Sequence, residues 1–223
     1  MNTNNNKKYE LTEETITFDT GDPILCYDEE LDTDFFEYEQ TTVHRIKAVR
    51  DFGDVHAGDL GGFIESEENL SHEGNCWVSD DATVYENAKV CDNAKVHENA
   101  KVCGNAKVCD NARVRWNARV YGNAIVRDNA LIDDCARVYD DAKVSVNAQV
   151  CGEACVYGHV QVSGNALIYE NARVYGNAIV CDMAKVAGHV QVYGNSQIFE
   201  DACVASDDDI VFDAKLGAGT VIQ

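Results

Sequence analysis

Residues 75–128 read NCWVSD DATVYE NAKVCD NAKVHE NAKVCG NAKVCD NARVRW NARVYG NAIVRD, a pattern that repeats every six residues. Taking every sixth residue from Val78 to Ile222 gives 25 positions, and each of them is Val, Ile or Leu. An amphipathic helix needs a period of about 3.6 residues, and an amphipathic strand needs a longer alternation, so neither explains the pattern. A six-residue rung that buries its aliphatic side chain inside a narrow prism does explain it.

A second inward position supports this interpretation. Four residues after each of the first 24 aliphatic positions comes a small position, which is Ala in 19 cases. The exceptions are Val160, Val190, Ser196, Asp208 and Thr220. The Asn or Asp before each Ala suits a corner, because these residues tolerate left-handed backbone angles. We therefore expect the chain to turn at that Asn or Asp.

Side chains three rungs apart test whether three rungs make one coil. The residue after the aliphatic position on one predicted face is Tyr85, Cys103, Tyr121, Tyr139, Tyr157, Tyr175 and Tyr193, whereas the same columns on the other two faces are mixed. An 18-residue coil explains this selection. The repeat therefore predicts an all-β fold, a single-stranded parallel β-helix of about eight coils, at about 4.8 Å per coil.

Residues 1–71 lack the repeat, and we expect them to form an acidic, β-rich cap on a β-helix that spans residues 72–223. Solenoids need such a cap to cover the apolar cross-section and open strand edges of the first coil. TVHRIKAV (42–49) is strand-like, and GDLGG (58–62) marks a tight turn. Residues 9–44 contain 12 acidic side chains and no Lys or Arg. The C-terminal GAGTVIQ is still in phase, which suggests an open end.

The stretch RIKAVRDFGDVHAGDLGGFIESEENLSHEGNCWV, residues 45–78, resembles the N-terminal module of YdcK-type hexapeptide-repeat proteins of bacteria and phages. Together with the repeat, the resemblance covers essentially the whole chain. It implies a left-handed β-helix, an exception to the usual crossover rule. Family members are often labelled transferases because acyltransferases share the rung pattern, but a fold alone does not define a function.

Composition narrows the classes of function. The chain has 18 basic and 39 acidic residues, a net charge of −21, which repels phosphate and argues against direct nucleic-acid binding. No run of about 18 apolar residues and no secretion signal is present, so we expect a cytoplasmic protein without a membrane partner. The ten cysteines are then expected to be thiols.

No catalytic residue is expected. Acyltransferases that share this fold carry a histidine that activates the acceptor, and loops that bulge between rungs to hold the acyl donor. No rung is interrupted here. His159 and His189 replace corner residues on different corners, and His97 faces outward near Lys95, Arg113 and Arg115. We interpret all three as ordinary surface residues and predict no cofactor.

Metal binding is not expected either. Cys91 and Cys109 are one predicted coil apart and should stack, with Arg127 next in the column. Zinc needs four ligands in a tetrahedron, and the sequence shows no third or fourth partner for these two thiols.

Two outward columns are candidate interaction sites. The first, which we call the ladder face, combines aromatic and cationic side chains: Tyr121, Tyr139, Tyr157, Tyr175, Arg119, Arg137 and Arg173. It either binds a partner or only stabilises the sheet. The second, the acidic edge, comprises Asp92, Asp110, Asp128, Asp182 and Glu200. It is a solvated corner, or else it imitates a phosphate backbone.

These observations favour a non-enzymatic binding or scaffold protein with a protein partner, for example a phage accessory protein that blocks a host or defence component. The alternatives are a coenzyme-A-dependent acyltransferase and an acidic DNA mimic. The ladder face and the open end also predict a homo-oligomer. We favour a dimer over the trimer of the acyltransferases, because that trimer places an active site between subunits.

Overall fold

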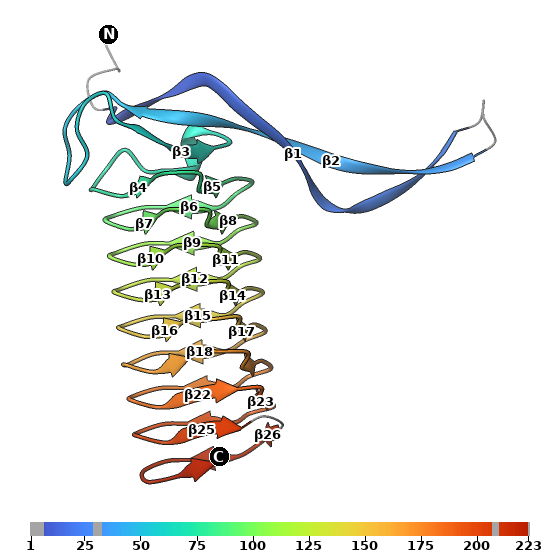
Figure 1. Ribbon diagram of the computed structural model, residues 1–223, viewed down its shortest axis with the longest axis vertical. Helices are drawn as coiled ribbons and strands as arrows, with labels where there is room; N and C mark the ends of the chain where they lie inside the picture. Colours follow the sequence, from blue (N-terminus) through green and yellow to red (C-terminus); the bar gives the residue numbers. More distant parts are fainter. Residues whose placement is uncertain (1–6, 29–32, 207–209, 223) are drawn as a thin grey trace.

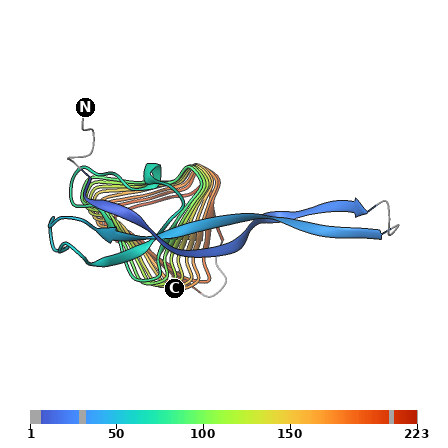
Figure 2. The same cartoon turned by 90° about the horizontal axis from the view of Figure 1, so that it is seen from above.

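The computed structural model describes residues 7–28, 33–206 and 210–222. It is a column of stacked coils with a long two-stranded arm across one end (Figure 1). Seen along the column, the coils superpose as a triangle (Figure 2). The all-β, parallel β-helix prediction is confirmed. Within these residue ranges no helix combines the length and apolarity that crossing a membrane requires.

Three sheets form the sides of the column. In spatial order, the first sheet contains β1 (Tyr9–Asp28), β2 (Thr33–Ala48), β3 (Leu60–Ile64), β5 (Thr83–Val84), β8 (Lys101–Val102), β11 (Arg119–Val120), β14 (Arg137–Val138), β17 (Cys155–Val156), β20 (Arg173–Val174), β23 (Gln191–Tyr193) and β26 (Ile210–Phe212). The second contains β4 (Trp77–Val78), β7 (Lys95–Val96), β10 (Arg113–Val114), β13 (Leu131–Ile132), β16 (Gln149–Val150), β19 (Leu167–Ile168), β22 (Lys185–Gly188), β25 (Cys203–Ser206) and β28 (Val221–Ile222). The third contains β6 (Lys89–Val90), β9 (Lys107–Val108), β12 (Ile125–Val126), β15 (Lys143–Val144), β18 (Gln161–Val162), β21 (Ile179–Val180), β24 (Gln197–Ile198) and β27 (Lys215–Leu216).

The core is the predicted prism. The inward aliphatic residues Val78, Val96, Val114, Val138 and Val174 are 0% exposed, and so are the Ala residues at the small positions from Ala82 to Ala202. Parallel strands on successive coils pair in register, as Val120 does with Val138. The buried Ser196 is tolerated because its hydroxyl donates to the carbonyl oxygen of Tyr193, at 2.6 Å.

The register slips near the C-terminal end. The six-residue count predicts Ile210 as the inward residue that follows Val192 in its column, but Val192 pairs with Val211, the next residue along the chain, and Val211 is buried. Ile198 pairs with Leu216, so the regular coil spacing is restored one strand later. An in-phase rung would have placed Asp208 at an interior position, where a carboxylate loses its hydration. Asp208 itself lies outside the described residues.

The corners differ from the prediction in which residue makes the turn. Positive φ angles occur two residues after the inward aliphatic residue, for example at Asp80 (58°), Glu86 (56°) and Gly104 (68°). The Asn or Asp before the Ala has a positive φ only at Asp213 (47°) among the described residues, where the register slip described above makes Val211 the inward residue. The Asn side chains instead form ladders between coils, as where Asn93 Nδ2 donates to Asn111 Oδ1 at 3.3 Å. These amide ladders stabilise successive coils.

The cap consists of the long β1–β2 hairpin, the strand β3, which pairs antiparallel with β2, and a short 3-10 helix, Glu67–Asn69. β1 and β2 pair antiparallel from Tyr9 with Ala48 to Asp28 with Thr33, and their distal part extends away from the column (Figure 1). TVHRIKAV lies mainly in β2, whereas the second half of GDLGG begins β3. Because β3 pairs with β5 in parallel, the hydrogen-bonded sheets begin before residue 72. The base of the arm packs on the first coil, where Lys8 and Tyr9 are fully buried.

Candidate functional site

The ladder face is a continuous stack of rings along the first sheet. Neighbouring rings from Tyr121 to Tyr193 lie 4.7–5.0 Å apart and within 5° of parallel. Phe212 continues the stack beyond Tyr193 at 4.8 Å, because the register slip brings it, and not Val211, to the outward position. Parallel in-register strands force this geometry, since each side chain lies one coil from its neighbour. The predicted tyrosine column is thus a real stack.

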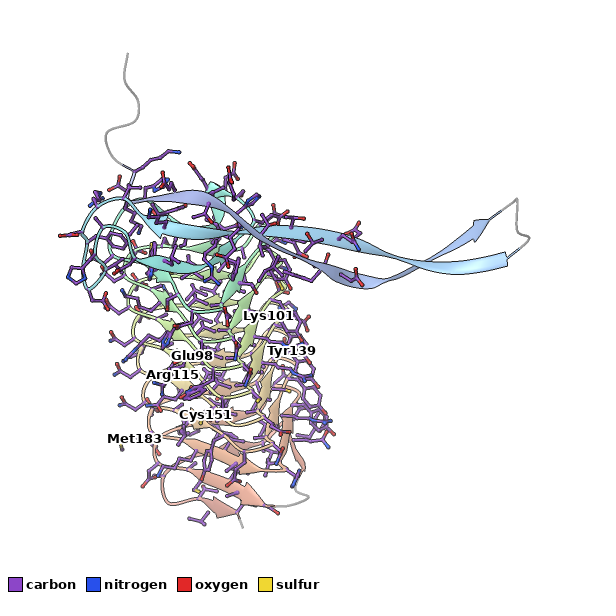
Figure 3. The ribbon with its side chains drawn as sticks, turned by 45° about the horizontal axis from the view of Figure 1, so that its top comes forward. Glu98, Lys101, Arg115, Tyr139, Cys151 and Met183 are labelled. Atoms are coloured by element: carbon purple, nitrogen blue, oxygen red, sulfur yellow. The ribbon has the colours of Figure 1, made fainter. Side chains whose placement is uncertain are left out.

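Tyr121, Tyr139 and Tyr157 are neutral phenols at physiological pH, because burial raises the pKa of each hydroxyl above its ordinary value. Burial, with smaller contributions from the Tyr121 and Tyr157 hydroxyls, raises the pKa of Tyr139 to about 12. The rings are half-buried and present their outer edges to solvent (Figure 3 labels Tyr139). The Tyr175 hydroxyl donates to Gln191 Oε1 at 3.3 Å, whereas the hydroxyls of Tyr121, Tyr139 and Tyr157 are available as hydrogen-bond donors to a partner.

Exposed cations lie beside this stack. Arg119 and Arg137 are adjacent partners on β11 and β14, and Arg173 lies two strands further along. Cys155 occupies the position between Arg137 and Arg173. All three arginines are exposed, and none makes an ion pair among the residues whose side chains the structure describes. Three unpaired guanidinium groups on a chain with net charge −21 form a local positive strip.

The acidic edge has a structural role that the sequence pattern does not reveal. The Asp92 Oδ2 atom accepts a hydrogen bond from the Asp110 backbone N–H, and Asp110 Oδ2 accepts one from Asp128, both at 3.2 Å. Asp182 and Glu200 repeat the arrangement toward the next coil. Each carboxylate satisfies a corner N–H that the backbone leaves without a strand partner. These hydrogen bonds explain why acids recur at left-handed corners.

A hollow of about 530 Å³ surrounds His97 at the junction of the cap and the second sheet. His97 Nδ1 lies 2.9 Å from Glu98 Oε2, and the same oxygen accepts from the Trp116 backbone N–H at 3.0 Å. Lys95 and Arg113 also line the hollow, and Lys95 pairs there with Asp54 of the cap. The sequence placed His97 near Lys95 and Arg113, but it gave no sign of Glu98 or of Asp54.

The remaining histidines do not assemble with His97. His159 is exposed and pairs with Asp141, Nδ1 to Oδ2, at 3.4 Å. His189 is exposed at another corner, where its backbone N–H donates to Ser206. Arg115, which the sequence placed near His97, instead makes a two-pronged contact with Asp133, at 2.9 and 2.6 Å.

The stacked thiols have a third neighbour that the sequence analysis missed. Cys91, Asp92 and Cys109 each place one potential ligand atom within 4.8 Å of the others. Burial, followed by the hydrogen bond and charge of Asp92, raises the pKa of Cys91 to about 12. A metal needs the thiolate, so this environment works against binding. Neither a tetrahedral set nor a fourth ligand appears among the described residues.

The repeat has a recognisable relative. Residues 166–182, which include β19 and β20, match the family model described as "YdcK Beta solenoid repeat". This part of the repeat is therefore similar to the YdcK solenoid repeat. An Escherichia coli K12 protein named "Uncharacterized acetyltransferase YdcK" is 35% identical to this chain over 78 residues. That match spans 35% of this chain and 20% of the relative, so the chain covers only a small part of the relative's length. The YdcK-type repeat thus agrees with the resemblance found in residues 45–78.

Proposed function

We propose that this protein is a non-enzymatic binding protein whose ladder face engages an acidic surface of another protein. The observation that carries the proposal is the unpaired arginine column beside a continuous tyrosine stack. Tyr and Arg are the residue types enriched at energetic hot spots of protein interfaces. Their stacking also reduces the side-chain entropy lost when a partner binds.

Charge distribution supports an acidic partner. The ladder face is cationic on a strongly acidic chain, so complementary charge would orient the partner toward this side of the column. The narrower expectation, a phage accessory protein that blocks a host or defence component, stays a prediction. So does a homodimer through the ladder face, for which light scattering should give twice the 24.5 kDa of one chain.

The interaction test uses a double variant, Tyr157→Ser with Arg173→Gln, as bait in an affinity pull-down from the native host. A protein that wild type captures should be reduced at least about tenfold, because a stacked aromatic and a charge-assisted contact are removed together. The matched control, Tyr169→Ser with Lys185→Gln, makes similar changes on the second sheet and should retain capture. Equal capture by both double variants would contradict the proposal.

A second candidate function is acyl transfer at the His97 hollow. The contact of His97 Nδ1 with Glu98 Oε2 would orient the imidazole and leave Nε2 to accept a proton from an acceptor group. Arg113 could receive an anionic part of the donor. The relative's printed name, an uncharacterized acetyltransferase, favours this candidate.

Titration of wild type and of His97→Ala with acetyl- and succinyl-coenzyme A, together with an assay of acyl transfer, separates the two functions, since an acyltransferase must turn over its donor at the His97 hollow. The binding-protein proposal predicts that neither compound is turned over and that His97→Ala leaves any heat of binding unchanged. It also predicts that His97→Ala, His159→Ala and His189→Ala each keep partner capture. Turnover of an acyl donor that His97→Ala abolishes, with the fold intact by circular dichroism, would replace the binding proposal with the enzyme.

The DNA-mimic alternative rests on the acidic edge and stays a prediction. One oxygen of each of its five carboxylates accepts a hydrogen bond from a backbone N–H, so corner stability already accounts for these residues. Competition with DNA for a basic protein remains its direct test.

A further inference from the structure

The tyrosine stack is interrupted at one coil near the arm. Cys103 occupies the position between Tyr85 and Tyr121 in the ladder column. Tyr85 packs edge-on against Phe18 of β1, with ring centroids 5.2 Å apart, and does not extend the stack. In the part of the chain whose side chains are described, Tyr139 covers one face of the Tyr121 ring and no aromatic ring covers the other. The ladder therefore lacks one ring where Cys103 stands.

A hollow of about 300 Å³ lies at this interruption. The arm contributes Phe18, Asp19 and Thr20, and the column contributes Tyr85, Cys103 and Tyr121. The Tyr85 side chain forms one wall of the hollow, beside Cys103. The arm meets the ladder face here, and Lys101 lies just below it (Figure 3).

The charge of the hollow is positive. Lys101, Arg119 and Arg137 line it, and Asp19 is the one carboxylate among its lining residues. None of the three cations makes an ion pair with a side chain that the structure describes. Lys101 Nζ lies 5.4 Å from the centre of the Phe18 ring. Asp19 is partly engaged, because its Oδ1 accepts from Gln40 Nε2 at 3.1 Å.

We propose that this hollow binds a small aromatic phosphate of the mononucleotide kind. The planar ring of the ligand would stack on the uncovered face of Tyr121, at the position in the stack where the chain has Cys103 in place of a tyrosine. Its phosphate would be held by the three unpaired cations. Guanidinium groups recognise phosphate through paired, charge-assisted hydrogen bonds, and bases stack well on aromatic side chains. The site shares Tyr121, Arg119 and Arg137 with the ladder face and adds a small-molecule ligand to the proposed macromolecule binding. Neither Tyr157 nor Arg173 lines it, so the double variant of the interaction test leaves this site intact and the two proposals fail separately.

Isothermal titration of the whole chain with adenosine 5′-monophosphate and with phenyl phosphate tests the site. Both compounds should bind. Adenosine, which lacks the phosphate, and inorganic phosphate, which lacks the ring, should each bind at least about tenfold more weakly. No binding of either aromatic phosphate at millimolar concentration, or equal binding of inorganic phosphate, would overturn the proposal.

Cys103→Tyr supplies the missing ring from the protein itself. It should abolish binding of adenosine monophosphate while leaving the fold and thermal stability intact. Cys151→Tyr makes the same change at the equivalent position of the second sheet and should bind like wild type. Arg119→Gln leaves the space beside Cys103 unfilled but removes one cation from the hollow, so it should weaken binding about tenfold. Unchanged binding by Cys103→Tyr and Arg119→Gln, with folding verified by circular dichroism, would place the ligand elsewhere and reject the site.

Discussion

Replacing Val138 by Asp should lower the free energy of unfolding by at least ~4 kcal/mol. Val138 is 0% exposed and pairs with Val120 and Val156 on the adjacent coils. The side chains around it are Val, Ile and Ala, none of which offers a hydrogen bond to a carboxylate. The substitution also lies mid-column, where both neighbouring coils depend on the damaged rung. Chemical denaturation followed by circular dichroism measures the change.

The neighbouring residue is the control for this prediction. Tyr139→Ser removes a half-buried ring that stacks on Tyr121 and Tyr157, and it should cost about 1 kcal/mol because the hydroxyl of serine remains solvated. Since the two residues are adjacent, the difference isolates the inward from the outward direction. Equal losses for the two variants would contradict the assignment of Val138 to the core.

The coil was predictable because one constraint repeats many times. An inward position inside a narrow prism accepts few side chains, so the Val and Ala columns appear in the sequence itself. The stack from Tyr121 to Tyr193 was predictable for the same reason. In-register pairing turns a regularly spaced sequence column into a spatial one.

The departures from the prediction depend on features that occur once. The register slip that buries Val211 occurs once, next to the sequence SDDDI at residues 206–210. The six-residue count continues unchanged through this stretch and so does not predict the slip. The left-handed corner was predicted at the Asn, one residue too late in the rung, because Asn tolerates left-handed backbone angles. The structure shows that the Asn side chain instead forms the amide ladders between coils. The long arm of β1 and β2 has no repeated pattern from which its length could be read.

The candidate sites also differ in whether they arise from a repeated feature of the sequence or from one that occurs once. The ladder face follows from one column and was found. The hollow at His97 includes Asp54 of the cap, and the hollow at Cys103 includes Phe18 of the cap. Both cap residues lie far in the sequence from the β-helix residues that line the same hollow. Only the packing of the cap on the first coils brings them together. Residues spaced 18 apart in the sequence therefore identify the faces of the β-helix, but they do not identify the hollows where the cap packs on its first coils.

Gly74 makes the first coil sensitive to a single methyl group. Its φ angle is +64°, and a Cβ atom there would lie 2.1 Å from the carbonyl oxygen of Asp92, which also accepts the Cys76 N–H at 2.8 Å. The coil would have to move, and the buried Lys8 would lose its 2.8 Å hydrogen bond to the Cys76 carbonyl. Gly74→Ala should therefore cost about 3 kcal/mol and loosen the cap.

Gly104→Ala is the matched change at another corner of the column. Its φ angle is similar, +68°, but the new Cβ would lie 2.8 Å from the nearest atom, the Gly122 nitrogen, and Glu86 holds the same corner position one coil earlier with φ 56°. It should cost only about 1 kcal/mol, the usual penalty for a left-handed Ala. Trp77 is 5% exposed and reports the first coil directly, so Gly74→Ala should shift its fluorescence to longer wavelength and Gly104→Ala should not. Identical spectra for the two variants would show that the cap does not depend on the close approach at Gly74.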